Sequence, residues 1–125
     1  MQISSFLGIA HADIGEISGI THRRTGMIDL AMVQSLRNLS EDDALYRQYG
    51  LLIVDECHHV PAFNFESIMK RVAVQAVLGL TATPYRRDGL QDLIVMQCGP
   101  VRHKMSSRST TASRELTLEV LVRNT

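Results

Sequence analysis

Two adjacent carboxylates follow a short apolar run in the middle of the chain. Residues 51–54 (LLIV) are all apolar, and Asp55 and Glu56 come directly after them. A continuous apolar run is typical of a strand that is covered on both faces in a parallel sheet. Ligands of such sheets bind beyond the carboxyl ends of the strands. There Asp55 can hold a hydrated Mg²⁺ ion that bridges nucleotide phosphates, and Glu56 can orient and deprotonate an attacking water. The alternative interpretation is a strand that ends in a solvated acidic turn.

A second strand end carries two hydroxyl groups. Residues 79–84 read GLTATP, so that Thr81 and Thr83 stand just before Pro84. The proline disfavours helix in the residue before it and makes the chain turn. Hydroxyls at this place can link a nucleotide site to a neighbouring surface, because each both donates and accepts hydrogen bonds. A turn that only caps the strand is the other interpretation.

Cysteine and histidine residues suggest two further chemistries. Cys57 precedes His58 and His59, and single residues of these types occur at His11, Cys98 and His103. Structural zinc sites need paired ligands at short spacing, and the chain has no second pair of this kind. A Cys57–His58 nucleophile pair lacks flanking residues that would build an oxyanion hole. Both interpretations are therefore weaker than the carboxylate site.

Basic side chains gather after the second strand end. The cluster comprises Arg86, Arg87, Arg102, His103 and Lys104. These residues predict either an ordinary solvated loop or a contact with a phosphate backbone or with another nucleotide-binding segment.

Helices and strands alternate along the first hundred residues. Such alternation favours βαβ units and an α/β fold with a parallel sheet flanked by helices. The local patterns predict helices over 3–10, from the N-cap Ser40 with acidic residues 41–43 to Gly50, and from Pro61 onwards. They predict strands over 14–20, 28–33, 51–54 and 76–80, and an edge strand over 116–122.

Length and composition limit the class of protein. The 125 residues fit one modest domain, and 45% hydrophobic with 21% charged residues argue against wholesale disorder. A formal net charge of zero makes binding through a massive basic surface improbable. Apolar runs of only a handful of residues predict no membrane span. The N-terminal residues lack a leader, and two cysteines make no disulfide framework, so we expect a cytoplasmic protein.

The two strand ends resemble a known family. Residues 55–58 (DECH) resemble the DExH form of helicase motif II, and residues 80–84 (LTATP) resemble motif III of superfamily 2 DEAD/DEAH-box helicases and of restriction-enzyme translocase subunits. The resemblance covers roughly residues 1–100, as the latter part of a first RecA-like domain of the P-loop NTPase class. It implies a helicase or translocase that uses ATP and Mg²⁺ and acts on nucleic acid, with DNA expected and RNA as the alternative.

The resemblance also implies a role for individual residues. Asp55 matches the acid that coordinates Mg²⁺, and Glu56 matches the catalytic base. His58 matches the residue that links the ATP site to motif III, and Thr81 and Thr83 match the hydroxyls that couple hydrolysis to movement along nucleic acid.

Weaker matches concern nucleic-acid contacts. Gln34 and Ser35 match a segment that touches the nucleic-acid backbone, although Met32 and Val33 replace the threonine and aromatic residue usual there. Arg86 and Arg87 are the basic residues that we expect to contribute to the same surface.

One half of an ATPase site has no match. A P-loop ends in Gly-Lys-Ser/Thr, whereas the only lysines, Lys70 and Lys104, do not follow glycine. We therefore expect residues 1–100 to be a partial domain that lacks motif I, and residues 101–125 to be a linker that leads to a second RecA-like domain. The isolated chain should then be inactive. The alternative is a non-catalytic remnant that binds protein or DNA.

Overall fold

The computed structural model describes residues 2–82, 89, 91–104 and 119–124. The helices, with two short 3-10 turns among them, are α1 (Gln2–Leu7), η1 (His11–Asp13), α2 (Val33–Arg37), α3 (Leu45–Gln48), η2 (Cys57–His59), α4 (Ala62–Arg71) and α5 (Gln91–Cys98). The strands are β1 (Ile14–Ile17), β2 (His22–Arg23), β3 (Ile28–Ala31), β4 (Leu51–Val54), β5 (Ala76–Thr81), β6 (Val101–Lys104) and β7 (Glu119–Asn124). Among the described residues, no helix has both the length and the apolar character needed to cross a membrane.

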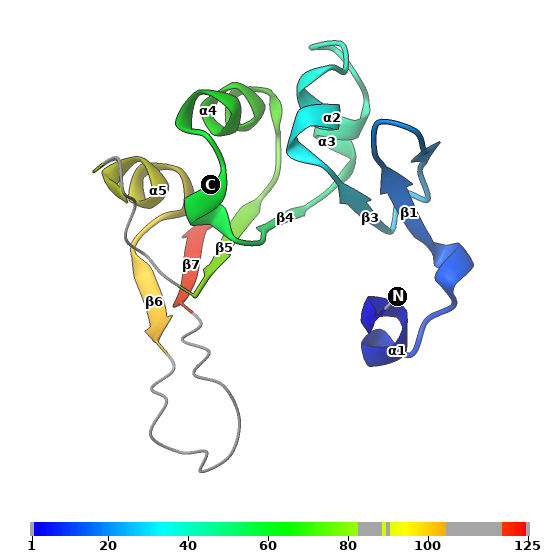
Figure 1. Ribbon diagram of the computed structural model, residues 1–125, viewed down its shortest axis with the longest axis horizontal. Coiled ribbons are helices and arrows are strands. Elements are labelled where there is room, and N and C mark those ends of the chain that lie inside the picture. Colours follow the sequence, from blue (N-terminus) through cyan, green and yellow to red (C-terminus); the bar gives the residue numbers. More distant parts are fainter. Residues whose placement is uncertain (1, 83–88, 90, 105–118, 125) are drawn as a thin grey trace.

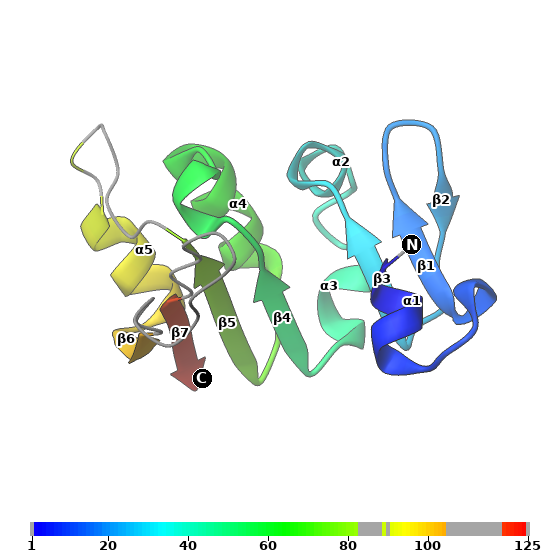
Figure 2. The same cartoon turned by 60° about the horizontal axis from the view of Figure 1, so that its bottom comes forward.

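The strands form two sheets. Their orders are β2-β1-β3 and β4-β5-β7-β6, and Figure 2 shows the sheets side by side with β3 next to β4. In each sheet one pair is parallel, β1 with β3 and β4 with β5. β2 runs antiparallel to β1, and β7 runs antiparallel to both β5 and β6. The α/β fold with parallel strands and flanking helices is thus confirmed.

One face of the second sheet is covered by helices. Figure 1 shows α4 and α5 on the same side of β4 and β5. The core on that side is made of buried residues from the turn, the strand and both helices, namely Cys57, Val60, Phe65, Val74, Val77, Ile94 and Cys98. Because α4 and α5 lie on the same side, this layer covers only one face.

The opposite face of β4 is open. Leu51 and Ile53 remain 52% and 53% exposed, whereas Leu52 and Val54 pack against the core. The expectation that residues 51–54 are buried on both faces is therefore wrong. The physical reason is that an apolar run shows only that both faces can be covered, whereas a covering layer must come from other elements.

The helix predicted from Ser40 begins later. Residues 40–43 form a turn, closed by a hydrogen bond from the Asp43 amide to the Ser40 carbonyl of 3.1 Å, and α3 starts at Leu45. The Asp43 carboxylate accepts a hydrogen bond of 2.9 Å from the Leu45 amide and pairs with Arg24 at 2.7 Å. These contacts hold the pKa of Asp43 below its usual value, the Arg24 hydrogen bond contributing most. Ser40 is thus not the N-cap, because Asp43 supports the helix start one turn later.

The end of the chain joins the second sheet. Residues 119–124 form β7, which lies between β5 and β6, so the prediction of an edge strand over 116–122 is wrong in its placement. Arg102, His103 and Lys104, for which a solvated loop is one of the two interpretations above, are exposed residues of β6. A second RecA-like domain beyond residue 100 stays a prediction.

A half-buried carboxylate links β3 to the segment that leads into β4. Asp29 accepts hydrogen bonds from the Thr25 amide and hydroxyl at 2.9 and 2.6 Å and also from the Tyr49 hydroxyl. Burial acts to raise the pKa of Asp29, but hydrogen bonds from Thr25, Tyr49 and Gly26 outweigh it and hold that pKa below its usual value. Burial and the Asp29 contact raise the pKa of Tyr49 to about 12.

Candidate active site

The carboxyl ends of β4 and β5 bring the predicted site residues to one edge of the sheet. The two strands are parallel and Val54 pairs with Gly79, so the turn after β4 lies beside the end of β5. That turn carries Asp55, Glu56 and His58, and Thr81 is the last residue of β5. Residues far apart in sequence are therefore neighbours because of the parallel pairing.

Glu56 has an unusual backbone conformation. Its φ of 48° places it in the left-handed region, and within the described residues it is the only non-glycine residue with a positive φ. The conformation is supported by a hydrogen bond of 2.9 Å from the Glu56 amide to Asp55 Oδ1 and by one of 2.8 Å from the His59 amide to the Glu56 carbonyl. Non-glycine residues held in this region cluster at functional sites. The turn leaves Asp55 and Glu56 exposed at the sheet edge.

A histidine joins the two strand ends. His58 Nδ1 lies 2.5 Å from Thr81 Oγ1 and 3.4 Å from Glu56 Oε2. The Thr81 residue is 1% exposed and the His58 side chain 10% exposed, whereas the Glu56 side chain is 54% exposed. His58 thus connects an exposed carboxylate to a buried hydroxyl.

Cys57 lies behind the turn in the core. It is fully buried next to Cys98 at the end of α5, and both pack over Gly79. The hydrogen bond with Cys98 lowers the pKa of Cys57, against the opposing effect of burial. The positions of the two cysteines in the sequence do not indicate this contact. The available signal was Gly79, because a glycine inside an apolar strand often marks a close approach of other atoms.

The remaining predicted site residues are distributed differently. Gln34 is exposed on α2, whereas Ser35 on the same helix is buried. Thr83, Arg86 and Arg87 lie outside the described residues. The described geometry therefore brings together Asp55, Glu56, His58 and Thr81, and their roles stay predictions.

The donor set at the turn fits magnesium. Mg²⁺ prefers oxygen ligands and is usually held by one or two carboxylates together with water and substrate phosphates. Asp55 and Glu56 provide such carboxylates at an exposed edge. In the described ranges, no three His, Cys, Asp or Glu side chains come together as a metal-binding group.

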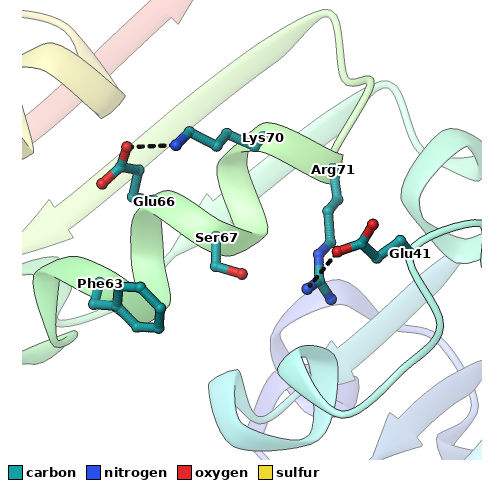
Figure 3. Close-up of a pocket in the computed structure, with 6 residues that line it drawn as sticks. All are labelled: Glu41, Phe63, Glu66, Ser67, Lys70 and Arg71. Carbon is teal, nitrogen blue, oxygen red and sulfur yellow. Dashed lines mark hydrogen bonds and ion pairs between the residues drawn. The ribbon is translucent and has the colours of Figure 1, made fainter.

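A separate groove lies on α4. It has a volume of about 340 Å³ and is lined by Glu41, Phe63, Glu66, Ser67, Lys70 and Arg71. Figure 3 shows that its charged groups pair with each other, Lys70 with Glu66 at 2.7 Å and Arg71 with Glu41 at 3.4 Å. The groove contains none of the residues of the strand-end site, and its charges are already neutralised.

Comparisons with known proteins relate most of the chain to one family. Residues 2–86 match the family described as type III restriction enzyme, res subunit. A protein of Acanthamoeba polyphaga mimivirus, provisionally named ATP-dependent RNA helicase L396, is 34% identical over 74 residues, which are 59% of this chain and 14% of the viral protein.

Two cellular relatives carry DNA-related names. The DNA 3'-5' translocase XPB2 of Sulfurisphaera tokodaii is 38% identical over 64 residues, 51% of this chain and 15% of the relative. The general transcription and DNA repair factor IIH helicase/translocase subunit XPB of Dictyostelium discoideum is 33% identical over 94 residues, 74% of this chain and 12% of the relative. The chain thus spans only a small part of these relatives. No solved structure matches it.

Proposed function

The chain belongs to the type III restriction enzyme, res subunit, family, and from this premise we propose that it is part of an ATP-dependent superfamily 2 helicase or translocase. In this proposal the turn after β4 positions the magnesium ion and the attacking water. The end of β5 couples hydrolysis to movement along nucleic acid. The proposal rests on one observation above all, the 2.5 Å contact between His58 and Thr81 beside the two carboxylates.

The carboxylates have different roles in the proposed reaction. Asp55 would hold magnesium, which when bound neutralises charge on the transferred phosphate. Glu56 would accept the proton of the attacking water, and its exposed side chain leaves room for that water. Protonation of Glu56 would change its 3.4 Å contact with His58. His58 would then shift against Thr81, with which it is also in contact. Thr83 is the second proposed coupling hydroxyl.

Nucleic acid is the proposed substrate, with DNA preferred. The relatives named after DNA translocation or DNA repair support DNA, and the viral relative named after RNA keeps RNA as the alternative. We propose that Gln34, Ser35, Arg86 and Arg87 contribute contacts to the phosphate backbone. Of the two residues on α2, Gln34 is exposed and Ser35 is buried, so Gln34 is the more accessible of them.

The phosphates of ATP need further residues. Neither lysine of the chain stands in a Gly-Lys-Ser/Thr segment, and the chain matches 12–15% of the length of three relatives. We propose that a P-loop segment and a second RecA-like domain, in addition to residues 1–125, complete the hydrolase. The second candidate is a non-catalytic module that binds protein or DNA.

The test is ATP hydrolysis with a Glu56→Gln variant. In a longer protein that contains this chain and a P-loop, we expect the variant to lose hydrolysis at least about 100-fold, because removal of a general base costs 10²–10⁴ in rate. ATP binding should persist, because the amide keeps the size of the side chain. Steady-state turnover with and without DNA, and equilibrium binding of a fluorescent ATP analogue, measure the two effects.

Two controls make the result decisive. Glu66→Gln, on the exposed surface of α4, should leave turnover unchanged. The 125-residue chain alone should show no turnover above its own Glu56→Gln variant. Unchanged hydrolysis in the longer Glu56→Gln protein would refute the assignment of the base. Nucleic-acid binding without any ATP turnover in that protein would favour the non-catalytic module.

A further inference from the structure

We propose that Cys57 and Cys98 are the site of a reversible intramolecular disulfide that ties the turn η2 to the carboxyl end of α5. These are the only two cysteines of the chain, and both are fully buried in one hydrophobic cluster. They are separated by 41 positions in sequence, so their proximity is a product of the tertiary structure. The expectation from the sequence, that two cysteines make no disulfide framework, did not include this contact.

Gly79 makes the approach of the two sulfur atoms possible. A Cβ atom built on Gly79 would lie 3.0 Å from Cys98 Sγ and 3.3 Å from Cys57 Sγ. Both sulfur atoms therefore border the same small space above the backbone of β5. The proximity of Cys98 also lowers the pKa of the Cys57 thiol, against the opposing effect of burial. Since both sulfur atoms lie within 3.3 Å of the same point, they are close neighbours in the core.

The reaction is thiol–disulfide exchange with a small-molecule disulfide. One cysteine thiolate attacks a sulfur of glutathione disulfide, which breaks the S–S bond of the reagent and releases one glutathione thiolate. The second cysteine thiolate then attacks the protein sulfur of the mixed disulfide and releases the second glutathione. The protein loses two hydrogen atoms in total, and the reagent is reduced to two thiols. Because both sulfur atoms are buried, exchange proceeds only during transient openings of the turn. This requirement slows the reaction but does not change its equilibrium.

The disulfide would immobilise the turn that bears the site residues. Cys57 stands between Glu56 and His58, so a covalent bond to α5 limits the movement of both. The bond also restricts the unfolded chain by closing a long loop, which stabilises the folded state. The effect on catalysis rests on the function proposed above, whereas formation of the disulfide does not.

The test compares the disulfide equilibrium in the folded and the unfolded chain. The 125-residue chain is equilibrated without oxygen in glutathione buffers of graded oxidation, in native buffer and in concentrated urea, then quenched with acid and analysed by mass spectrometry. We expect a monomeric product 2 Da lighter, with the peptides of Cys57 and Cys98 linked. The equilibrium constant for formation of this product should be at least about tenfold larger in native buffer than in urea, because the fold holds the thiols together. By the same thermodynamic cycle, oxidation should raise the midpoint of thermal unfolding by about 5 °C or more.

Glycine variants supply a matched control. Gly79→Ala places a methyl group against both sulfur atoms. It should lower the equilibrium constant for disulfide formation in native buffer nearly to its value in urea, and leave the constant in urea unchanged. Gly50→Ala, where no atom lies within 4 Å of the added Cβ, should behave like the unchanged chain. The proposal is overturned if the equilibrium constant for disulfide formation in the unchanged chain is equal or smaller in native buffer than in urea. It is also overturned if only mixed disulfides or disulfides between chains form. This result does not depend on folding of the Gly79→Ala variant.

Discussion

At the scale of a single residue, the backbone of Glu56 carries a conformational cost. A φ of 48° is the left-handed region, which costs a non-glycine residue about 1–2 kcal/mol, while asparagine tolerates it better. The backbone conformation of the proposed catalytic base therefore lowers the free energy of unfolding of the chain. Such strain at functional sites is held in place by the surrounding structure, here by the contacts of Asp55 and His59.

This cost leads to a stability prediction. We expect Glu56→Asn to increase the free energy of unfolding by about 0.5–1 kcal/mol while abolishing any activity that needs the carboxylate. Urea unfolding followed by circular dichroism measures the change. Asp55→Asn, on the neighbouring residue without a positive φ, is the control and should not stabilise the chain. A destabilised Glu56→Asn variant would show that the exposed Glu56–His58 contact outweighs the strain.

At the scale of elements, Asp29 and Tyr49 determine how β3 is attached to the segment before β4. A carboxylate whose pKa is lowered in the folded state contributes stability above its unfolded pKa, and that stability is lost as the pH falls through the folded value. The unfolded pKa of Asp29 is near 3.8, so the loss occurs below about pH 4. Tyr49, whose pKa is raised to about 12, has the opposite sign: it adds stability below pH 10 that is lost at higher pH.

Removal of the Tyr49 hydroxyl should therefore have a pH-dependent effect. We expect Tyr49→Phe to lower the free energy of unfolding by about 1.5–3 kcal/mol at pH 7, the range for a hydrogen bond to a charged group, and by much less below pH 3. Tyr46→Phe is the control, because the Tyr46 hydroxyl donates to the Leu36 carbonyl, which does not titrate. Urea unfolding at pH 7, 5 and 2.5 measures both variants. An equal effect of Tyr49→Phe at every pH would refute the role of the Asp29 charge.

At the scale of the whole molecule, the second sheet has helices on one face and an open surface on the other. Ile53 is 53% exposed on the open face, whereas Ile68 of α4 is buried, with 4% exposure. We expect Ile68→Ala to cost about 3 kcal/mol, as in other cores, and Ile53→Ala about 1 kcal/mol or less. Thermal or urea unfolding of the two variants gives the comparison. Equal costs would mean that the face of Ile53 is covered in solution.

Local chemistry made parts of this protein predictable. The apolar runs 51–54 and 76–80 became β4 and β5, and Pro61 does precede a helix, because these features depend on nearby residues. The family also followed from short motifs, and residues 2–86 match it. The predicted start of α3 was wrong because the Leu45 amide at the beginning of the helix donates its hydrogen bond to Asp43, not to Ser40. Asp43 is held there by Arg24, which comes from a distant turn.

The sequence by itself determined the α/β class, the family, and the residues at the ends of β4 and β5, since each depends on residue types within one short segment. Only the tertiary structure decided which strand ends meet, which face of β4 stays open, and where β7 inserts. It alone brought Cys57 to Cys98, whereas the contact of His58 with Thr81 is one that the family resemblance implied. The physical reason is that strand pairing and layer packing depend on contacts between residues far apart in the chain, and local patterns contain no information on which partners will meet.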